Sequence, residues 1–334
     1  MRKYNIPIFV PHRGCPYDCV FCNQNRITGN LKETRPFDVT NTIEEYLKTL
    51  PKADRNIEVA FFGGSFTGIP IDEQSALMER VTPYIKSGVI DGIRLSTRPD
   101  YISREILDNL KKYGVTTIEL GVQSMVDSVL KAANRGHSED DVINAVQLIR
   151  EYDFSLGLQM MTGLPGDTNE YSIETAKRII ALKPDLVRIY PTLTIKDTYL
   201  EKLYRMGKYT PQTLDDAVIL AKELMLMFEK ADITVIRIGL QPTDEINENA
   251  SVVAGPFHAS FGELVESAVY YDLITEQLSN MSCKATVFVN PKEISKATGN
   301  KRSNIIKIKE QTGIDIKIAG DKSLAKREVR CTCY

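Results

Sequence analysis

The chain has 334 residues, of which 43% are hydrophobic and 26% are charged, and its formal net charge is -2. This composition excludes a disordered or fibrous chain, and the length suits a large α/β domain with a smaller second one. The near-neutral charge excludes a global attraction to nucleic acid or membrane. No stretch approaches the ~18 apolar residues of a membrane span, and the N-terminus does not read as a signal peptide, so we expect a cytoplasmic protein.

Short β-rich runs alternate with amphipathic helical patterns over the first 240 residues. This alternation predicts an α/β fold, a parallel (β/α) barrel that is partial and has about six βα units. The predicted strands are Ile6–Val10, Ile57–Phe62, Gly92–Ser96, Thr117–Val122, Ser155–Met161, Leu186–Tyr190 and Ile233–Ile238. The predicted helices are Thr42–Leu50, Asp72–Ser87, Ser103–Tyr113, Glu139–Glu151, Asn169–Leu182 and Leu214–Ala231.

The alternation stops after Ile238, where a polar connector leads into a helix over about Phe261–Asn280. A compact β-α-α-β unit then follows, and we predict domains at 1–240, 241–281 and 282–334. The last segment is basic: residues 291–334 hold 11 Lys and Arg against 5 Asp and Glu, a local net charge of +6. A basic tail on an acidic body predicts contact with a polyanion, or else a solvated basic face. The unit's predicted elements are Ala285–Val289, Lys292–Thr298, Asn304–Thr312 and Asp315–Ile318.

Cys15, Cys19 and Cys22 follow the first predicted strand with the spacing C-x3-C-x2-C. Parallel barrels place their chemistry at the carboxyl ends of strands, where this loop falls. Three thiolates on a short loop can hold three irons of a 4Fe–4S cluster and leave the fourth open to another ligand. The alternatives are a zinc site completed by His12 or by the Cys331 and Cys333 pair, and buried inert thiols. We expect reduced cysteines, since closely spaced cysteines in a cytoplasmic chain favour metal over disulfides.

At this loop the sequence resembles the radical S-adenosylmethionine (radical SAM) superfamily, with Phe21 directly before the last cysteine as is usual there. It looks most like the branch that contains the catalytic subunit of Elongator, and more distantly like oxygen-independent coproporphyrinogen oxidase. The resemblance covers roughly residues 7–240 and, beyond them, the stretch GPFHASFGELVES. It implies two cofactors, the 4Fe–4S cluster and S-adenosylmethionine, and an enzyme that cleaves the latter reductively to a 5′-deoxyadenosyl radical.

Further motifs carry the resemblance and imply site residues, although ordinary ion pairing or packing is the alternative for each. FFGGSF at 61–66 implies cofactor contacts from a glycine-rich turn. ELGVQS implies a contact to the ribose or methionine part of the cofactor, and NRGH implies one to the methionine carboxylate. LQMMTGLPGD implies a further contact to the ribose. LSTRPD and RIYPTLTIKDTYLEKLYRMGKY imply residues at the barrel mouth. The implied cofactor-binding residues are Gly63, Gly64, Ser65, Gln123, Arg135 and Gln159, and the implied catalytic residues are Arg98 and Tyr190.

Two departures limit the resemblance. The chain leaves no room for the acetyltransferase domain of Elongator-type proteins, so we expect no acetyl-derived product from it alone. Gln24 stands where coproporphyrinogen oxidase has a further cysteine, which disfavours porphyrin chemistry.

The C-terminal unit resembles a KH domain, a module that clamps single-stranded nucleic acid with a G-x-x-G loop. Its loop reads GNKR, so Arg302 replaces the second glycine, and a capping domain without ligand is the alternative. The roles of Cys283, Cys331 and Cys333 stay open between a second metal site and silent thiols.

Three functions follow from these patterns. The first is a radical SAM enzyme that modifies RNA, most simply tRNA, gripped by residues 291–334 and supplied with electrons by a flavodoxin or ferredoxin. The second is a radical lyase or isomerase that acts on a small molecule such as a nucleobase or metabolite. The third is a non-enzymatic binding protein with a structural cluster or zinc ion.

Overall fold

The computed structural model describes residues 2–10, 19–23, 34–241, 246–247, 250–279 and 281–333. It divides into two compact units, one of Met1–Gln212 with Met227–Phe257 and one of Thr213–Leu226 with His258–Tyr334. The predicted domain boundaries stay a prediction, and in this division α10 (Leu214–Lys230) contributes to both units.

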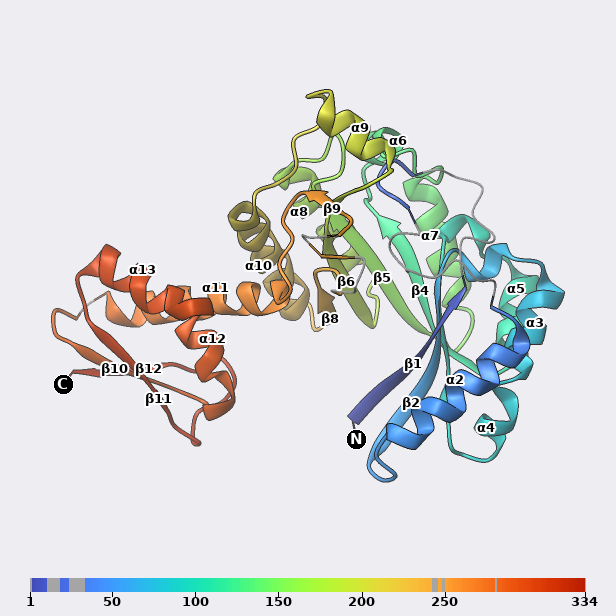
Figure 1. The fold of residues 1–334 in the computed structure, drawn as a ribbon, viewed down its shortest axis with the longest axis horizontal. Coiled ribbons are helices and arrows are strands. Elements are labelled where there is room, and N and C mark those ends of the chain that lie inside the picture. Colours follow the sequence, from blue (N-terminus) through green and yellow to red (C-terminus); the bar gives the residue numbers. More distant parts are fainter. Residues whose placement is uncertain are drawn as a thin grey trace. The chain divides into compact units, whose positions relative to one another are not determined.

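The first unit is built on a seven-stranded sheet whose strands are all parallel and stand in chain order, β1-β2-β3-β4-β5-β6-β8 (Figure 1). This arrangement confirms the predicted parallel, partial barrel, which is a half-barrel. Its strands are β1 (Arg2–Val10), β2 (Arg55–Gly63), β3 (Gly92–Thr97), β4 (Val115–Gln123), β5 (Ser155–Thr162), β6 (Leu186–Pro191) and β8 (Thr234–Ile238).

Helices connect the strands. None of the helices in the described part of the chain is long and apolar enough to cross a bilayer. The helices of this unit are α2 (Pro36–Thr49), α3 (Ile71–Glu79), α4 (Thr82–Lys86), α5 (Arg104–Lys112), α6 (Asp127–Ala132), α7 (Glu139–Ile149), α8 (Asn169–Ala181) and α9 (Tyr199–Arg205). Two short strands, β7 (Thr194–Ile195) and β9 (Val252–Ala254), form a separate antiparallel pair.

The predicted single helix Asp72–Ser87 is wrong, because the structure has two helices there, α3 and α4. Pro83 stands in the first turn of α4, where its missing N–H needs no partner. Inside one continuous helix the same proline would remove a backbone hydrogen bond and clash with the preceding turn.

One long-range contact shows that the sheet is curved. The guanidinium carbon of Arg188, on β6, lies 5.6 Å from the centre of the Phe62 ring, on β2. Strands β2 and β6 are separated by three others, and neighbouring strands lie about 4.8 Å apart, so the two side chains could not meet on a flat sheet. They therefore share the concave face. The alternate residues of β3, Ile93 and Leu95, are fully buried on the opposite face, as a helix-covered sheet requires.

The second unit contains α11 (Phe261–Leu278), followed by β10 (Ala285–Val289), α12 (Ile294–Thr298), α13 (Ser303–Thr312), β11 (Ile316–Gly320) and β12 (Arg330–Cys333). Strand β10 is central, parallel to β11 and antiparallel to β12. Its apolar face packs on α11 and α13 around Tyr270, Val287 and Ile308, all fully buried.

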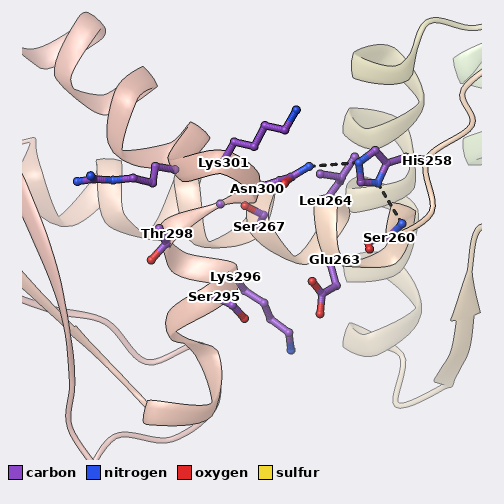
Figure 2. Close-up of a pocket in the computed structure, with 12 residues that line it drawn as sticks. His258, Ser260, Glu263, Leu264, Ser267, Ser295, Lys296, Thr298, Asn300 and Lys301 are labelled. Carbon is purple, nitrogen blue, oxygen red and sulfur yellow. Dashed lines mark hydrogen bonds between the residues drawn. The ribbon is translucent and has the colours of Figure 1, made fainter.

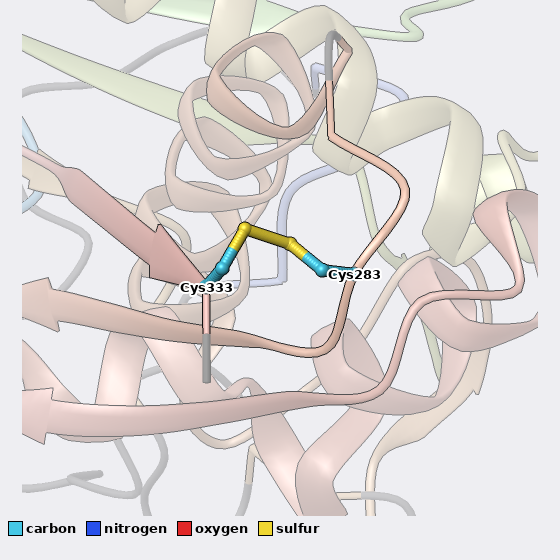
Figure 3. The surroundings of a disulfide bond; sticks show 2 residues. All are labelled: Cys283 and Cys333. Carbon is cyan, nitrogen blue, oxygen red and sulfur yellow. A yellow bond between two sulfur atoms is a disulfide. The ribbon is translucent and has the colours of Figure 1, made fainter.

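A disulfide joins Cys283, just before β10, to Cys333 at the end of β12 (Figure 3). The expectation of reduced thiols is therefore wrong for these two residues. Spacing along the chain could not show it, because the pair is 50 residues apart and meets only when β12 aligns with β10, Ala285 opposite Cys333. Cys331 stays free and packs against the core of this unit.

Candidate functional site

The cysteine segment is anchored at the carboxyl edge of the half-barrel. Of the three predicted cluster ligands, Cys19 is buried, Cys22 is half-buried, and Cys15 lies outside the described residues. The Cys22 N–H donates to the Cys19 carbonyl at 2.9 Å, so the two thiols stand on one tight turn. In the part of the chain that the structure describes, no third potential metal ligand joins them.

Two neighbouring helices hold this turn in place. The Val20 N–H donates to the carbonyl of Ala133 at the end of α6, and the Val20 carbonyl accepts from the Leu200 N–H in the first turn of α9 at 2.7 Å. Val20 also packs in one apolar cluster with Ala133 and Leu200. Both α6 and α9 were missed by the sequence prediction, because each is only six or seven residues long and has no clear periodicity.

Arg135 is the charged side chain at the cysteine turn. Its Nη1 lies 3.6 Å from Cys19 Sγ, and its Nη2 donates to the Gly121 carbonyl, at the end of β4, at 2.8 Å. The guanidinium is buried, and its Nε has no hydrogen-bond partner among the described residues. A buried cation with an unused donor beside a thiol suits a bound anion such as a carboxylate.

Gln123 extends over Gly121, as Arg135 does. It has φ +67°, a left-handed conformation that is uncommon for a residue other than glycine, and the pairing of β4 with β5 shifts register there. A Cβ on Gly121 would stand 2.8 Å from Arg135 Nη2 and 2.9 Å from Gln123 Nε2. The absent side chain of Gly121 thus lets both polar groups converge over the strand end. Unusual backbone angles of this kind cluster at ligand sites.

The glycine-rich turn after β2 folds back on β1. Gly63 has φ +114°, and a Cβ there would lie 2.5 Å from the Val10 carbonyl oxygen, so only glycine fits. The Gly64 N–H donates to that same oxygen at 3.0 Å. Ser65 is buried, and its Oγ is 2.7 Å from Thr97 Oγ1 and accepts from the Arg98 N–H. Ser65 therefore ties the turn to β3, and the predicted contact from its side chain to a cofactor stays a prediction.

Arg98 forms an ion pair with Asp100, two residues further along the chain. Its guanidinium makes two hydrogen bonds of 2.9 Å to the carboxylate of Asp100, and the side chain is buried. The predicted substrate contact stays a prediction. The pKa of nearby His137 is lowered to about 3, first by burial and then by the charges of Arg135 and Arg98.

The concave face carries a buried ion-pair network. Glu119 is fully buried, and its carboxylate accepts from Arg94 at 3.0 Å and from Arg188 at 2.9 Å. Gln159 Nε2 also donates to Glu119, at 3.0 Å, which occupies the side chain predicted to touch a ribose. Arg94 reaches Glu58 as well, so two carboxylates balance two guanidinium groups. Burial lowers the pKa of Arg188, but the hydrogen bonds and charge interactions with Glu119 and Tyr190 together raise it above its usual range.

Sequence reasoning missed this network, although a signal was present. Single charged residues stand in the middle of strands expected to be buried on both faces, in IRLST, TIELG and VRIYP. A charge that enters such a strand needs a partner on a neighbouring one.

Tyr190 continues the concave face toward the carboxyl edge. It follows Arg188 by two residues on β6, so both side chains share one face, and Arg188 Nη1 donates to the Tyr190 hydroxyl at 3.3 Å. Burial raises the pKa of Tyr190, which keeps the phenol protonated. The predicted position of Tyr190 at the barrel mouth agrees with this geometry, and its catalytic role stays a prediction.

The second unit has a pocket of about 450 Å³ where α12 meets α13 (Figure 2). Asn300 Nδ2 lies 3.2 Å from His258 Nε2 at its wall, and Lys301 extends from the loop. Lys301 and Arg302 both have positive φ, +50° and +64°, which is unusual for two successive residues other than glycine. The pocket also contains the carboxylate of Glu263.

The cysteine turn, the buried arginine and the glycine turn lie at the carboxyl edge of a parallel half-barrel, the edge at which α/β barrel enzymes carry their active sites. The sequence profile of the Radical SAM superfamily matches residues 9–179, and that of the Radical_SAM C-terminal domain matches residues 184–271. The chain belongs to the radical SAM superfamily, and it is an enzyme of that superfamily.

Similar proteins agree with the Elongator-like resemblance. A tRNA uridine(34) acetyltransferase of Methanocaldococcus infernus is 29% identical over 203 residues, which cover 55% of this chain and 38% of that protein. Human Elongator complex protein 3 is 28% identical over 212 residues, 58% of this chain and 39% of that one. The chain thus spans about two fifths of these relatives. The solved structure of the archaeal Elp3 of M. infernus, lacking its N-terminus, matches with a TM-score of 0.65 and 24% identity over 81% of this chain and 63% of that chain.

Proposed function

We propose that this enzyme cleaves S-adenosylmethionine reductively at a 4Fe–4S cluster held by Cys15, Cys19 and Cys22, and that it modifies RNA. When bound, the cluster supplies the electron that breaks a carbon–sulfur bond of the sulfonium. One observation carries this proposal: Arg135 bridges Cys19 Sγ and the end of β4 with a donor unused.

The described residues fit both cofactors. Cys19 and Cys22 stand on one turn, and Arg135 offers a fork to a carboxylate. The glycine at position 63 lets the turn fold onto the Val10 carbonyl, and the proposed cofactor contacts of Gly63 and Gly64 lie beyond that backbone contact. We assign Gln123 to the ribose or methionine part of the cofactor because its side chain, like that of Arg135, extends over Gly121 at the end of β4. Gln159 can contribute only if it leaves Glu119.

RNA as substrate is supported by the relatives and by the second unit. The M. infernus relative is named a tRNA uridine(34) acetyltransferase, and residues 291–334 of this chain carry a net charge of +6. The positive φ angles of Lys301 and Arg302 place two exposed cations on a tight loop, which suits contact with phosphate groups. We therefore expect total tRNA to bind, with an affinity that falls as salt rises.

The test of the chemistry is anaerobic. The reconstituted protein is reduced with dithionite, given S-adenosylmethionine, and assayed for 5′-deoxyadenosine by mass spectrometry. We expect the product with the wild-type chain and its loss in Cys19→Ala. A well-formed cluster that yields none, with and without tRNA, would contradict the proposal.

A small-molecule substrate is the second candidate, favoured by Arg302 in place of the second loop glycine. A gel-shift assay of Lys301→Glu/Arg302→Glu separates the two. Loss of tRNA binding in the variant supports RNA, whereas no binding of tRNA by the wild-type protein at about 150 mM salt supports the small molecule.

A further inference from the structure

Helix α9 lies directly on the cysteine turn through its inner face. Leu200 is fully buried and belongs to the apolar cluster that contains Val20, with Phe21 and Leu203 packed against it. The 2.7 Å hydrogen bond from the Leu200 N–H to the Val20 carbonyl fixes the start of the helix one residue away from Cys19. Among the described elements, α9 therefore forms part of the outer layer over the cluster ligands.

The outer face of the same helix carries two large apolar side chains beside its charged ones. Tyr199 and Met206, seven residues apart and therefore on one side of the helix, are 56% and 58% exposed. Large exposed side chains that gather on one short segment mark interaction sites more often than isolated ones do.

Lysines surround these apolar side chains. Lys202 and Lys208 are exposed on the segment itself, and Lys131 is exposed on α6, which packs in the same apolar cluster through Val129. None of these three lysines has an acidic partner in the part of the chain that the structure describes, whereas Arg205 is neutralised by Glu201 at 2.7 Å. We call the set of Lys131, Tyr199, Lys202, Met206 and Lys208 the α9 patch.

A small apolar centre with a basic rim is complementary to an acidic protein that binds briefly. Weak electron-transfer encounters bury little area, and opposite charges steer them. The arginine of α9 is held by Glu201, and the exposed Lys301–Arg302 loop of the second unit is the stronger candidate for contact with RNA phosphates. The features of the α9 patch therefore favour a protein partner.

We propose that the α9 patch is the docking surface for an acidic one-electron donor protein of the flavodoxin type. The proposal rests on the proposed function, because reductive cleavage consumes one electron that no described group of the chain supplies. Docking here brings the donor to the outer side of the cysteine turn. In each encounter the donor is oxidised by one electron, the cluster is reduced by one, and no covalent bond changes.

The first test measures binding, not activity. The probe is oxidised flavodoxin, titrated calorimetrically into the reconstituted full-length protein. We expect binding that weakens as salt rises from about 50 to about 300 mM, and that is weaker by about tenfold in Lys202→Glu/Lys208→Glu. Tyr199→Ala should weaken binding as well, with less change in its salt dependence.

A matched control reverses two lysines elsewhere on the barrel. Lys86, at the end of α4, and Lys112, at the end of α5, are exposed and precede β3 and β4, so they lie at the amino edge of the sheet. Lys86→Glu/Lys112→Glu makes the same change in net charge and should leave flavodoxin binding unchanged.

The second test compares two reductants. Reduced flavodoxin should reduce the cluster more slowly in Lys202→Glu/Lys208→Glu, whereas dithionite should act equally on both proteins. The proposal is overturned if flavodoxin does not bind the wild-type protein, if the variant binds it normally, or if the variant loses tRNA binding instead. If dithionite gives no 5′-deoxyadenosine, the proposed function fails, and the calorimetry still decides where flavodoxin docks.

Discussion

At the scale of single residues, the site depends on polar groups that converge because one side chain is missing. Gly121 leaves space for both Arg135 Nη2 and Gln123 Nε2, each of which is closer than 3 Å to the position that a Cβ of residue 121 would take. Arg135 then spans the distance from Cys19 to β4, and only a fork can make both contacts. The geometry of the guanidinium, and not its charge alone, is what the position requires.

Arg135→Lys tests this requirement. The lysine keeps the positive charge but cannot contact Cys19, the Gly121 carbonyl and a ligand together. We expect S-adenosylmethionine to bind about tenfold to a hundredfold more weakly in equilibrium dialysis, the loss of one charge-assisted hydrogen bond. The content of iron and the melting temperature should stay close to those of the wild type. Unchanged affinity would remove Arg135 from the cofactor site.

His137 predicts how the first unit responds to pH. Its pKa is about 3 in the fold, below the unfolded value of 6.5, because burial disfavours the charged ring. Between these values the unfolded chain binds the additional proton, so stability rises with pH up to about 6.5 and is then constant. His137→Gln, which keeps an N–H for the Val122 carbonyl, should lose this dependence. In urea unfolding, the stability difference between pH 7.5 and pH 5 should shrink by about 2 kcal/mol.

At the scale of elements, the half-barrel is held from inside by charges and from outside by apolar helices. Glu119 on β4 pairs with Arg94 on β3 and Arg188 on β6, so one carboxylate ties together strands that are not all neighbours. Removing one member leaves a buried guanidinium without compensation, which costs more than the intact pair contributes.

Glu119→Gln should therefore lower the free energy of unfolding of the first unit by about 3–5 kcal/mol, measured by urea denaturation. The matched control is Glu151→Gln, which breaks the exposed ion pair with Arg104 and should hardly change the midpoint. Equal effects of the two substitutions would show that the network contributes nothing specific.

The sequence predicted the repetitive elements well and the connections poorly. Each strand of the half-barrel was found within a few residues, because buried parallel strands read as short apolar runs. Helix α9 was missed because its identity as a helix depends on Leu200 packing on Val20, a contact between residues 180 positions apart. The roles of Arg98 and Gln159 could not be read in advance either, since Asp100 and Glu119 claim them only in the folded chain.

At the scale of the whole molecule, the two units require different redox conditions. The chemistry proposed for the half-barrel needs a reduced cluster and therefore reducing conditions. The second unit has a disulfide between Cys283 and Cys333 that closes its last strand onto β10. We therefore expect the reductant that the first unit requires to lower the stability of the second unit.

Cys333→Ser separates these demands. A cross-link between residues 50 positions apart stabilises a fold by about 4 kcal/mol in the chain-entropy account. We expect the substitution, or dithiothreitol added to the wild type, to lower the melting transition of the second unit and to leave that of the first unit in place. Cys331→Ser is the control, because this thiol is free and packs on the same core. If reductant leaves both transitions of the wild type unchanged, the second unit does not depend on its disulfide, and tRNA binding should then be equal in reduced and oxidised protein.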